Sequence, residues 1–274
     1  MSSLTLTRER FIERYGRFFG SQRMATIQNL GYLLVEAWGE GPYVFDAEGN
    51  RYLDLWNVGG VNSLGHRNPA VVRAMEEATR SQDYGSLFFF SEAKGQLAEA
   101  LARTTPGRLE ATLPAVTGSE AIDQAIKLAR GSTGRTEILH GDHGYNGVTG
   151  FALTMIGAAD MREWAEPLIP DFRAVRYGDL ESLREAISER TAAVVLEPVR
   201  TDYDGRAPAA DYFPEVRRLC DEHGAKLIID EVVTGMGRLG HLWGIDRWGV
   251  EPDMLVTAKG FSGGMYPISA VVMR

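Results

Sequence analysis

From residue 92 onwards, segments with helical periodicity alternate with short apolar runs. The periodicity predicts helices near residues 92–103, 119–130, 181–188 and 212–223. The apolar runs predict strands at residues 112–116, 136–140, 192–196, 226–229, 254–257 and 268–272. Such alternation is typical of βαβ units, in which the strands run parallel and helices cover both faces of the sheet. The expected fold class is therefore α/β, with a doubly wound, mostly parallel sheet.

The first part of the chain follows a different pattern. Residues 4–19 have helical periodicity with mixed charges, whereas residues 35–55 alternate between apolar and polar positions around two turn sequences rich in glycine. These patterns predict a helix and then a β-meander. We therefore expect an N-terminal segment over residues 1–55 and a large domain over residues 56–274.

Composition narrows the class of protein without identifying it. The 274 residues are 44% hydrophobic and 24% charged, which is ordinary for a globular α/β protein. The net charge of -8 gives no electrostatic reason to expect nucleic acid or an acidic membrane as a partner. The single cysteine, Cys220, has no internal disulfide partner, and no apolar run approaches the roughly 18 residues of a membrane span. We expect a cytoplasmic protein.

An acidic and a basic residue follow two of the predicted strands. Asp230 comes directly after the run 227–229, and Lys259 follows the run 254–257. Parallel strands bring their carboxyl ends to one edge of a sheet, where open α/β folds bind ligands. A lysine amine and a carboxylate in one crevice are the groups that hold pyridoxal 5'-phosphate (PLP), as Schiff-base partner and as partner of the pyridinium nitrogen. Taken alone, the pair is more often a cap or loop aspartate and a solvated surface lysine.

The turn before the predicted helix at residues 119–130 has the composition of an anion site. Gly118 lets the backbone approach a ligand closely, Ser119 supplies a hydroxyl, and the first helical N–H groups carry the positive end of the helix dipole. The alternative is an ordinary serine N-cap, which capping preferences alone favour.

Two other clusters carry weaker signals. His140, Asp142 and His143 are spaced like metal ligands, but no further ligand has a convincing context, so we expect no metal site. The run that includes Phe88–Phe90 is apolar enough to be part of the core.

Several short motifs follow one another in a characteristic order. They are Gly118-Ser119-Glu120-Ala121, Tyr145-Asn146-Gly147, Glu197-Pro198, the run from Asp230 to Gly240, Pro252-Asp253 and Ala258-Lys259-Gly260. In this order the chain resembles the class III (ω-amino) aminotransferases, from roughly residue 30 to its end. The run that starts at Asp230, with Lys259 after the next strand, is the most specific part. The resemblance implies the large domain of a fold-type I PLP transferase.

The resemblance also implies a role for each matching residue. Lys259 would form the Schiff base with PLP and Asp230 would pair with the pyridine nitrogen, so these two are the catalytic candidates. The cofactor-binding set that it implies comprises Gly118 and Ser119 at the phosphate, Tyr145 and Val232 on the two faces of the ring, Glu197 of the Glu-Pro step, and Asp230 and Lys259 themselves.

Three positions depart from the family pattern. Asn146 stands where the family usually has histidine, which removes an imidazole from the site. Val233 stands where many members have glutamine, so a hydrogen bond to the phenolic oxygen of the cofactor is lost or supplied elsewhere. Residues 200–205 replace a continuation rich in glutamine and glycine, which leaves open whether an acid in this loop gates the substrate.

As a function, the resemblance implies a homodimeric aminotransferase that moves an amino group from an ω-amine or amino acid donor to a 2-oxo acid. Two alternatives stay open: an aminomutase on the same scaffold, since Val233 also occurs in such relatives, and a non-catalytic truncated subunit. Family members continue beyond Arg274, so the resemblance implies an incomplete large domain and an absent C-terminal small domain. The stretch 64–66 and Phe88–Phe90 resemble segments that build the dimer surface.

Overall fold

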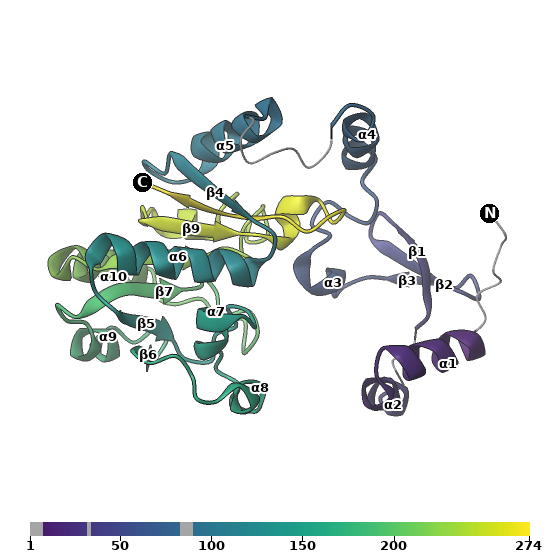
Figure 1. The fold of residues 1–274 in the computed structure, drawn as a ribbon, viewed down its shortest axis with the longest axis horizontal. Helices are drawn as coiled ribbons and strands as arrows, with labels where there is room; N and C mark the ends of the chain where they lie inside the picture. The colour runs from purple at the N-terminus through teal and green to yellow at the C-terminus, as the bar shows by residue number, and fades with distance from the viewer. Residues whose placement is uncertain (1–7, 32–33, 83–89) are drawn as a thin grey trace.

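A seven-stranded sheet dominates the computed structural model, which describes residues 8–31, 34–82 and 90–274 (Figure 1). Its strands are β4 (Ala111–Ala115), β5 (Glu137–Gly141), β6 (Phe172–Val175), β7 (Thr191–Leu196), β8 (Lys226–Asp230), β9 (Met254–Thr257) and β10 (Ser269–Met273). Their order across the sheet is β4-β10-β9-β8-β7-β5-β6. The strands from β9 to β6 pair in parallel, and β10 runs antiparallel to both of its neighbours. The predicted mostly parallel α/β sheet is confirmed.

The strand sequences explain their places in the sheet. All six residues of β7 are buried, as expected for a strand covered on both faces, and Val194 pairs with Leu227 of β8. β4 instead lies at the sheet edge and contains Pro114, which has no N–H to donate. An edge strand tolerates this residue because one side of its backbone needs no ladder partner.

Helices cover both faces of this sheet (Figure 1). On one face lies α6 (Gly118–Thr133), whose Ile122 and Ile126 are fully buried against β-strand residues. On the other face lie α9 (Leu180–Ala186) and α10 (Tyr212–His223), whose buried residues include Phe213 and Val216. The remaining helices of this part are α5 (Glu92–Thr104), α7 (Gly150–Thr154), α8 (Ala159–Arg162), η1 (Glu163–Ala165), η2 (Gly244–Trp248) and η3 (Lys259–Ser262).

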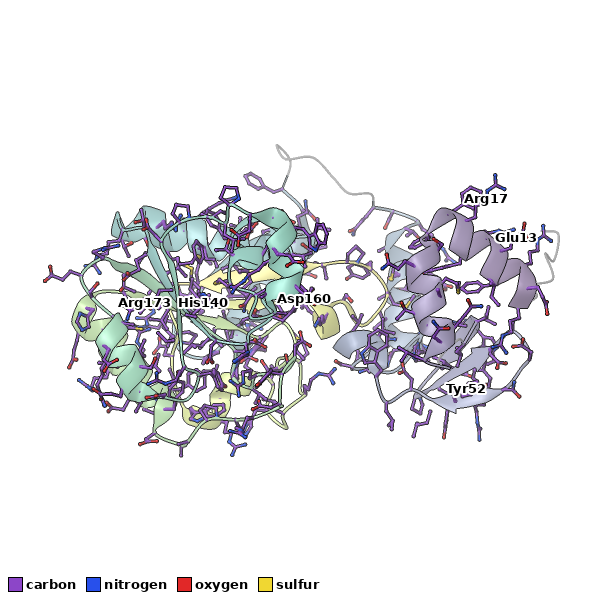
Figure 2. The ribbon with its side chains drawn as sticks, turned by 90° about the horizontal axis from the view of Figure 1, so that it is seen from below. Glu13, Arg17, Tyr52, His140, Asp160 and Arg173 are labelled. Carbon is purple, nitrogen blue, oxygen red and sulfur yellow. The ribbon has the colours of Figure 1, made fainter. Side chains whose placement is uncertain are left out.

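The N-terminal part lies beside the large sheet, and Glu13 and Arg17 of its first helix and Tyr52 of its last strand are labelled in Figure 2. Its elements are α1 (Arg8–Phe18), α2 (Ser21–Asn29), β1 (Glu36–Glu40), β2 (Tyr43–Asp46) and β3 (Arg51–Leu53). The three strands pair antiparallel in chain order, which confirms the predicted β-meander. The helices α3 (Asn57–Gly60) and α4 (Pro69–Ala78) follow. The division into two units at residue 55 remains a prediction.

Several elements were not predicted from the sequence. The start of α4 carried a usable signal, because Asn68 caps it by accepting from Ala70 N and Pro69 occupies its first turn. β6 is a four-residue edge strand in which Arg173 and Ala174 are exposed, so it gives little apolar signal. The prediction for Phe88–Phe90 falls mostly outside the described residues; only Phe90 is described, and it is exposed.

Candidate active site

A cavity of about 510 Å³ lies where β4, β8 and β9 end, on the carboxyl side of the sheet. Open α/β folds bind ligands at this edge. Of the residues proposed from the sequence, those lining the cavity are Gly118, Ser119, Tyr145, Asp230, Val232 and Lys259. The structure therefore brings together side chains that lie more than a hundred positions apart in the chain.

Asp230 ends β8 and is buried, with 3% of its surface exposed. Its Oδ2 accepts from Asn146 Nδ2 at 2.7 Å, and its Oδ1 accepts from Val232 N at 3.0 Å. Burial raises the pKa of Asp230 to about 6, although these two hydrogen bonds and the charge of Lys259 act in the opposite direction. At neutral pH Asp230 therefore carries a negative charge in the wall of the cavity.

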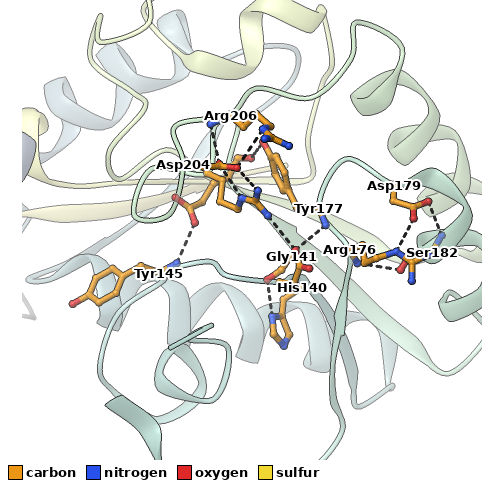
Figure 3. A network of polar contacts seen from close by, with 12 residues as sticks. His140, Gly141, Tyr145, Arg176, Tyr177, Asp179, Ser182, Asp204 and Arg206 are labelled. Atoms are coloured by element: carbon orange, nitrogen blue, oxygen red, sulfur yellow. Dashed lines mark hydrogen bonds and ion pairs between the residues drawn. The ribbon is translucent and has the colours of Figure 1, made fainter. Parts of the chain in front are cut away.

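Glu197 follows β7 and is buried behind Tyr145, outside the residues that line the cavity. Its Oε1 accepts from Tyr145 N at 3.2 Å, and Thr201 Oγ1 lies 2.9 Å from its Oε2. The ring of Tyr145 points away from the polar network that contains Tyr177 and Asp204 (Figure 3). Burial, with the charge of Asp230, raises the pKa of Glu197 to about 8. Glu197 thus positions Tyr145 by holding its backbone.

Ser119 contacts the loop that contains Tyr145, at a residue three positions further along the chain. Its Oγ accepts from Val148 N at 3.1 Å, which leaves its own hydrogen free to be donated to an anion. Gly147 has φ 123°, and a Cβ there would lie 2.1 Å from Ser119 Oγ. Only glycine therefore allows the loop to pass this close to the start of α6.

The first turn of α6 leaves two backbone amides available. Ser119 is not the N-cap that the alternative interpretation expected: α6 begins at Gly118, and Thr117 caps it by accepting from Glu120 N at 3.1 Å. Ala121 N donates to Thr117 O. Within the described residues, no group accepts from the amides of Gly118 and Ser119. Both residues line the cavity, so these amides and the helix dipole suit an anion.

Lys259 is the first residue of η3 and is separated from the end of β9 by one buried residue, Ala258. It has φ 47°, a left-handed conformation that costs free energy in a residue other than glycine and is common at functional sites. Ser262 Oγ donates to Lys259 O at 3.0 Å and supports this turn. In the described part of the chain, no other lysine lines the cavity. Among the described residues, Lys259 therefore supplies the cavity with its one side-chain amine.

The cavity also contains residues that the sequence did not single out. One of them is Val61, which comes from the N-terminal side of the chain. Asn146 was noted only as a departure from the family, and its contact with Asp230 had no sequence signal. Val233, the other departure, does not line the cavity.

The two histidines with metal-like spacing serve other contacts. His140 Nδ1 lies 3.1 Å from Gly141 O, and burial lowers the pKa of His140 to about 4. The ring of His143 stacks on Tyr203 with 4.3 Å between ring centroids. Over residues 8–31, 34–82 and 90–274, no three His, Cys, Asp or Glu side chains are grouped to hold a metal ion.

The residues of the cavity fit PLP by their chemistry. One end offers unpaired backbone amides and a hydroxyl for a phosphate, and the wall offers a buried carboxylate for a ring nitrogen. An amine capable of joining an aldehyde lies in the same cavity. The close approach of Val232 to Gly118 shapes the phosphate end.

Substitution of Gly118 tests this end of the cavity. A Cβ on Gly118 would lie 3.1 Å and 3.2 Å from the two Cγ atoms of Val232, so Gly118→Ala has to displace a cavity wall. Overpacking of this kind costs about 1–3 kcal/mol, and we expect PLP affinity to fall roughly tenfold. Equilibrium titration with PLP measures this change.

Gly131 offers a matched control on the same helix. No atom lies within 4 Å of a Cβ placed there, so Gly131→Ala should leave PLP affinity unchanged. It should also raise stability by about 0.5–1 kcal/mol, because alanine favours the helix. Equal PLP affinity in Gly118→Ala and the unsubstituted protein would contradict a phosphate site at this helix start.

Comparison with known proteins shows the family to which the chain belongs. Residues 27–274 match the family model described as aminotransferase class-III. The acetylornithine aminotransferase of Methanopyrus kandleri is 41% identical over 236 residues, covering 86% of this chain and 60% of that protein. The putrescine aminotransferase of Pectobacterium atrosepticum is 36% identical over 251 residues, covering 88% and 54%.

A solved structure agrees with these relatives. The chain superposes on a transaminase from the marine bacterium Virgibacillus with a TM-score of 0.89 and 28% identity, over 96% of this chain and 64% of that one. The chain thus spans between 54% and 64% of the length of these three proteins. The family model nevertheless covers most of the chain and includes every residue of the cavity. The chain therefore belongs to the class III aminotransferases, a PLP-dependent family.

Proposed function

We propose that this chain forms the PLP-binding part of an aminotransferase that moves an amino group from an ω-amine or amino acid donor to a 2-oxo acid. The observation that carries the proposal is the presence of Lys259, Asp230 and the free amides of Gly118 and Ser119 in one cavity. A lysine, a buried carboxylate and an anion site suit three groups of one cofactor: the aldehyde, the ring nitrogen and the phosphate.

When bound, PLP supplies an aldehyde that takes up amines and a ring that withdraws electrons from the substrate carbon. Lys259 would hold the aldehyde in the resting protein. When not bound to the aldehyde, Lys259 Nζ would be the base that takes a proton from the donor's carbon and the acid that gives it back. Asp230 would keep a proton on the ring nitrogen by virtue of its negative charge.

The other residues would orient the cofactor. Gly118 and Ser119 would bind the phosphate, with Tyr145 on one face of the ring and Val232 on the other. Glu197, which accepts from Tyr145 N, would act on the cofactor through Tyr145. We keep the division into a segment over residues 1–55 and a PLP-binding domain over residues 56–274 as part of this proposal.

For the donor we propose a terminal primary amine. The relatives described as putrescine aminotransferase and acetylornithine aminotransferase support this donor class. Within the described residues, Lys259 is also the one lysine or arginine that lines the cavity. For assembly we propose a homodimer, since Leu55, Trp56 and Leu64 are exposed apolar residues close in sequence to Val61 of the cavity wall.

We further propose a cytoplasmic protein that binds neither nucleic acid nor membranes. The net charge of -8 supports the absence of a nucleic acid partner, and the lone buried Cys220 is typical of a reducing compartment. None of the described helices is long and apolar enough to cross a membrane.

A donor panel tests the reaction. Putrescine, acetylornithine and α-amino acids are supplied singly with a 2-oxo acid, and the new amino acid is quantified. We expect the terminal amines to react. Conversion by α-amino acids alone would contradict the donor class. A protein that binds no PLP and transfers no amino group would contradict the proposed function.

A further inference from the structure

Asp230 and Glu197 are two buried carboxylates that both accept hydrogen bonds from the loop that contains Tyr145 and Asn146. Asp230 is the last residue of β8, and Glu197 follows the adjacent strand β7. Two consecutive loop residues contact them: Tyr145 N donates to Glu197 Oε1, and Asn146 Nδ2 donates to Asp230 Oδ2. Among the ion pairs of the described residues, none includes Glu197 or Asp230. Two neighbouring buried anions with no ion-pair partner are costly, even though the charge of Lys259 favours an ionised Asp230, so one of the two acids is expected to hold a proton.

The hydrogen-bond partners distinguish the two acids. Both oxygens of Asp230 accept from N–H groups, those of Asn146 and Val232, and an N–H group can only donate. A proton on Asp230 would find no acceptor among these contacts. This environment matches an ionised carboxylate.

Glu197 has a partner of a different kind. Its Oε1 accepts from Tyr145 N, but its Oε2 lies 2.9 Å from the hydroxyl of Thr201. A hydroxyl can accept as well as donate, so a proton on Oε2 could be donated to Thr201 Oγ1. The contacts of Glu197 are therefore compatible with a neutral acid.

We propose that Glu197 is protonated in the folded protein at neutral pH and that Asp230 carries the single negative charge of the pair. Glu197 is then a positioning residue: it holds Tyr145 N without placing a second anion beside the cavity. The inference rests on the proposed function for its significance, since the charge of Asp230 would face the cofactor ring. The protonation of Glu197 is measurable whether or not the protein transfers amino groups.

The charged groups around the pair agree with this assignment. Lys259, on η3, lowers the pKa of Asp230, and Asp202, from the loop after Glu197, raises it. For Glu197, burial and the charge of Asp230 raise the pKa and outweigh the hydrogen bonds from Thr201 and Tyr145. Tyr177 contributes only its hydroxyl, which lies 3.0 Å from the backbone oxygen of Glu197.

Infrared spectroscopy tests the proposal directly. A protonated carboxyl group gives a C=O stretching band that shifts in D₂O, and an ionised one does not. We expect such a band at pH 7 in the protein, lost as the pH rises past about 8. Glu197→Gln should remove the component that is lost near pH 8, whereas Glu231, whose pKa burial raises to about 7, gives a component of its own. Glu231→Gln is the matched control, because Glu231 is also buried but contacts Thr234 and Ile245 N instead; it should keep the Glu197 band.

Thr201→Val provides a second variant that leaves Glu197 in place. If Glu197 donates to the Thr201 hydroxyl, this substitution should shift the band without removing it. The proposal is overturned if Glu197→Gln leaves every protonated-carboxyl band of the protein at pH 7 intact. It is equally overturned if Asp230→Asn, rather than Glu197→Gln, removes the band. An unchanged band position in Thr201→Val would contradict the donated hydrogen bond.

Discussion

Replacing Lys259 by alanine is expected to abolish covalent attachment of PLP and to lower the rate of amino transfer by on the order of 10³-fold or more. The reason is that Lys259 is the one lysine lining the cavity within the described residues. PLP should still bind through the start of α6 and Tyr145. After borohydride reduction, the Lys259→Ala protein should release its cofactor on denaturation.

Lys127 offers a control for this substitution. It lies on α6, the helix that begins at the cavity, but its side chain is exposed on the surface. Lys127→Ala should retain both covalent PLP and activity. Covalent PLP that survives denaturation in Lys259→Ala would show that another amine holds the cofactor.

The second large effect is expected for Asp230→Asn. This substitution keeps the size of the side chain but removes its charge, so the ring nitrogen would lose the anion that keeps it protonated. Loss of one electrostatic stabiliser at an active site typically costs on the order of 10²-fold or more, and we expect a loss of this size in the first half-reaction.

The local contacts add to this effect. Both neighbours of the carboxylate, Asn146 Nδ2 and Val232 N, are donors, so the amide group of an asparagine would turn its own N–H₂ towards one of them. Single-turnover absorbance of bound PLP with a donor amine measures the half-reaction. Glu231→Gln is the control, because Glu231 does not line the cavity, and it should stay within a few-fold of the unsubstituted rate. A full rate in Asp230→Asn would remove Asp230 from the catalytic residues.

Much of the sheet could be predicted because its strands are continuous apolar runs. Residues 226–229 and 254–257 were placed within one residue of β8 and β9, and Asp230 and Lys259 were correctly expected at one edge. The antiparallel direction of β10 was not predictable, since a buried strand reads the same in either direction.

Details of the site depended on contacts between distant residues. The bond from Asn146 to Asp230 spans 84 positions, and local sequence patterns carry no information about such a contact. The cap of α6 could not be decided from the sequence, because Thr117 and Ser119 are both good capping residues. Glu197 was grouped with the cofactor-binding residues by resemblance, whereas its side chain contacts the backbone of Tyr145.

The central claim is that Lys259 is the amine that holds PLP. Borohydride reduction of the protein with PLP, followed by proteolysis and peptide mass mapping, tests it most directly. We predict a phosphopyridoxyl group on the peptide that contains Lys259. A phosphopyridoxyl group on Lys94, Lys127 or Lys226, with Lys259 unmodified, would contradict the assignment.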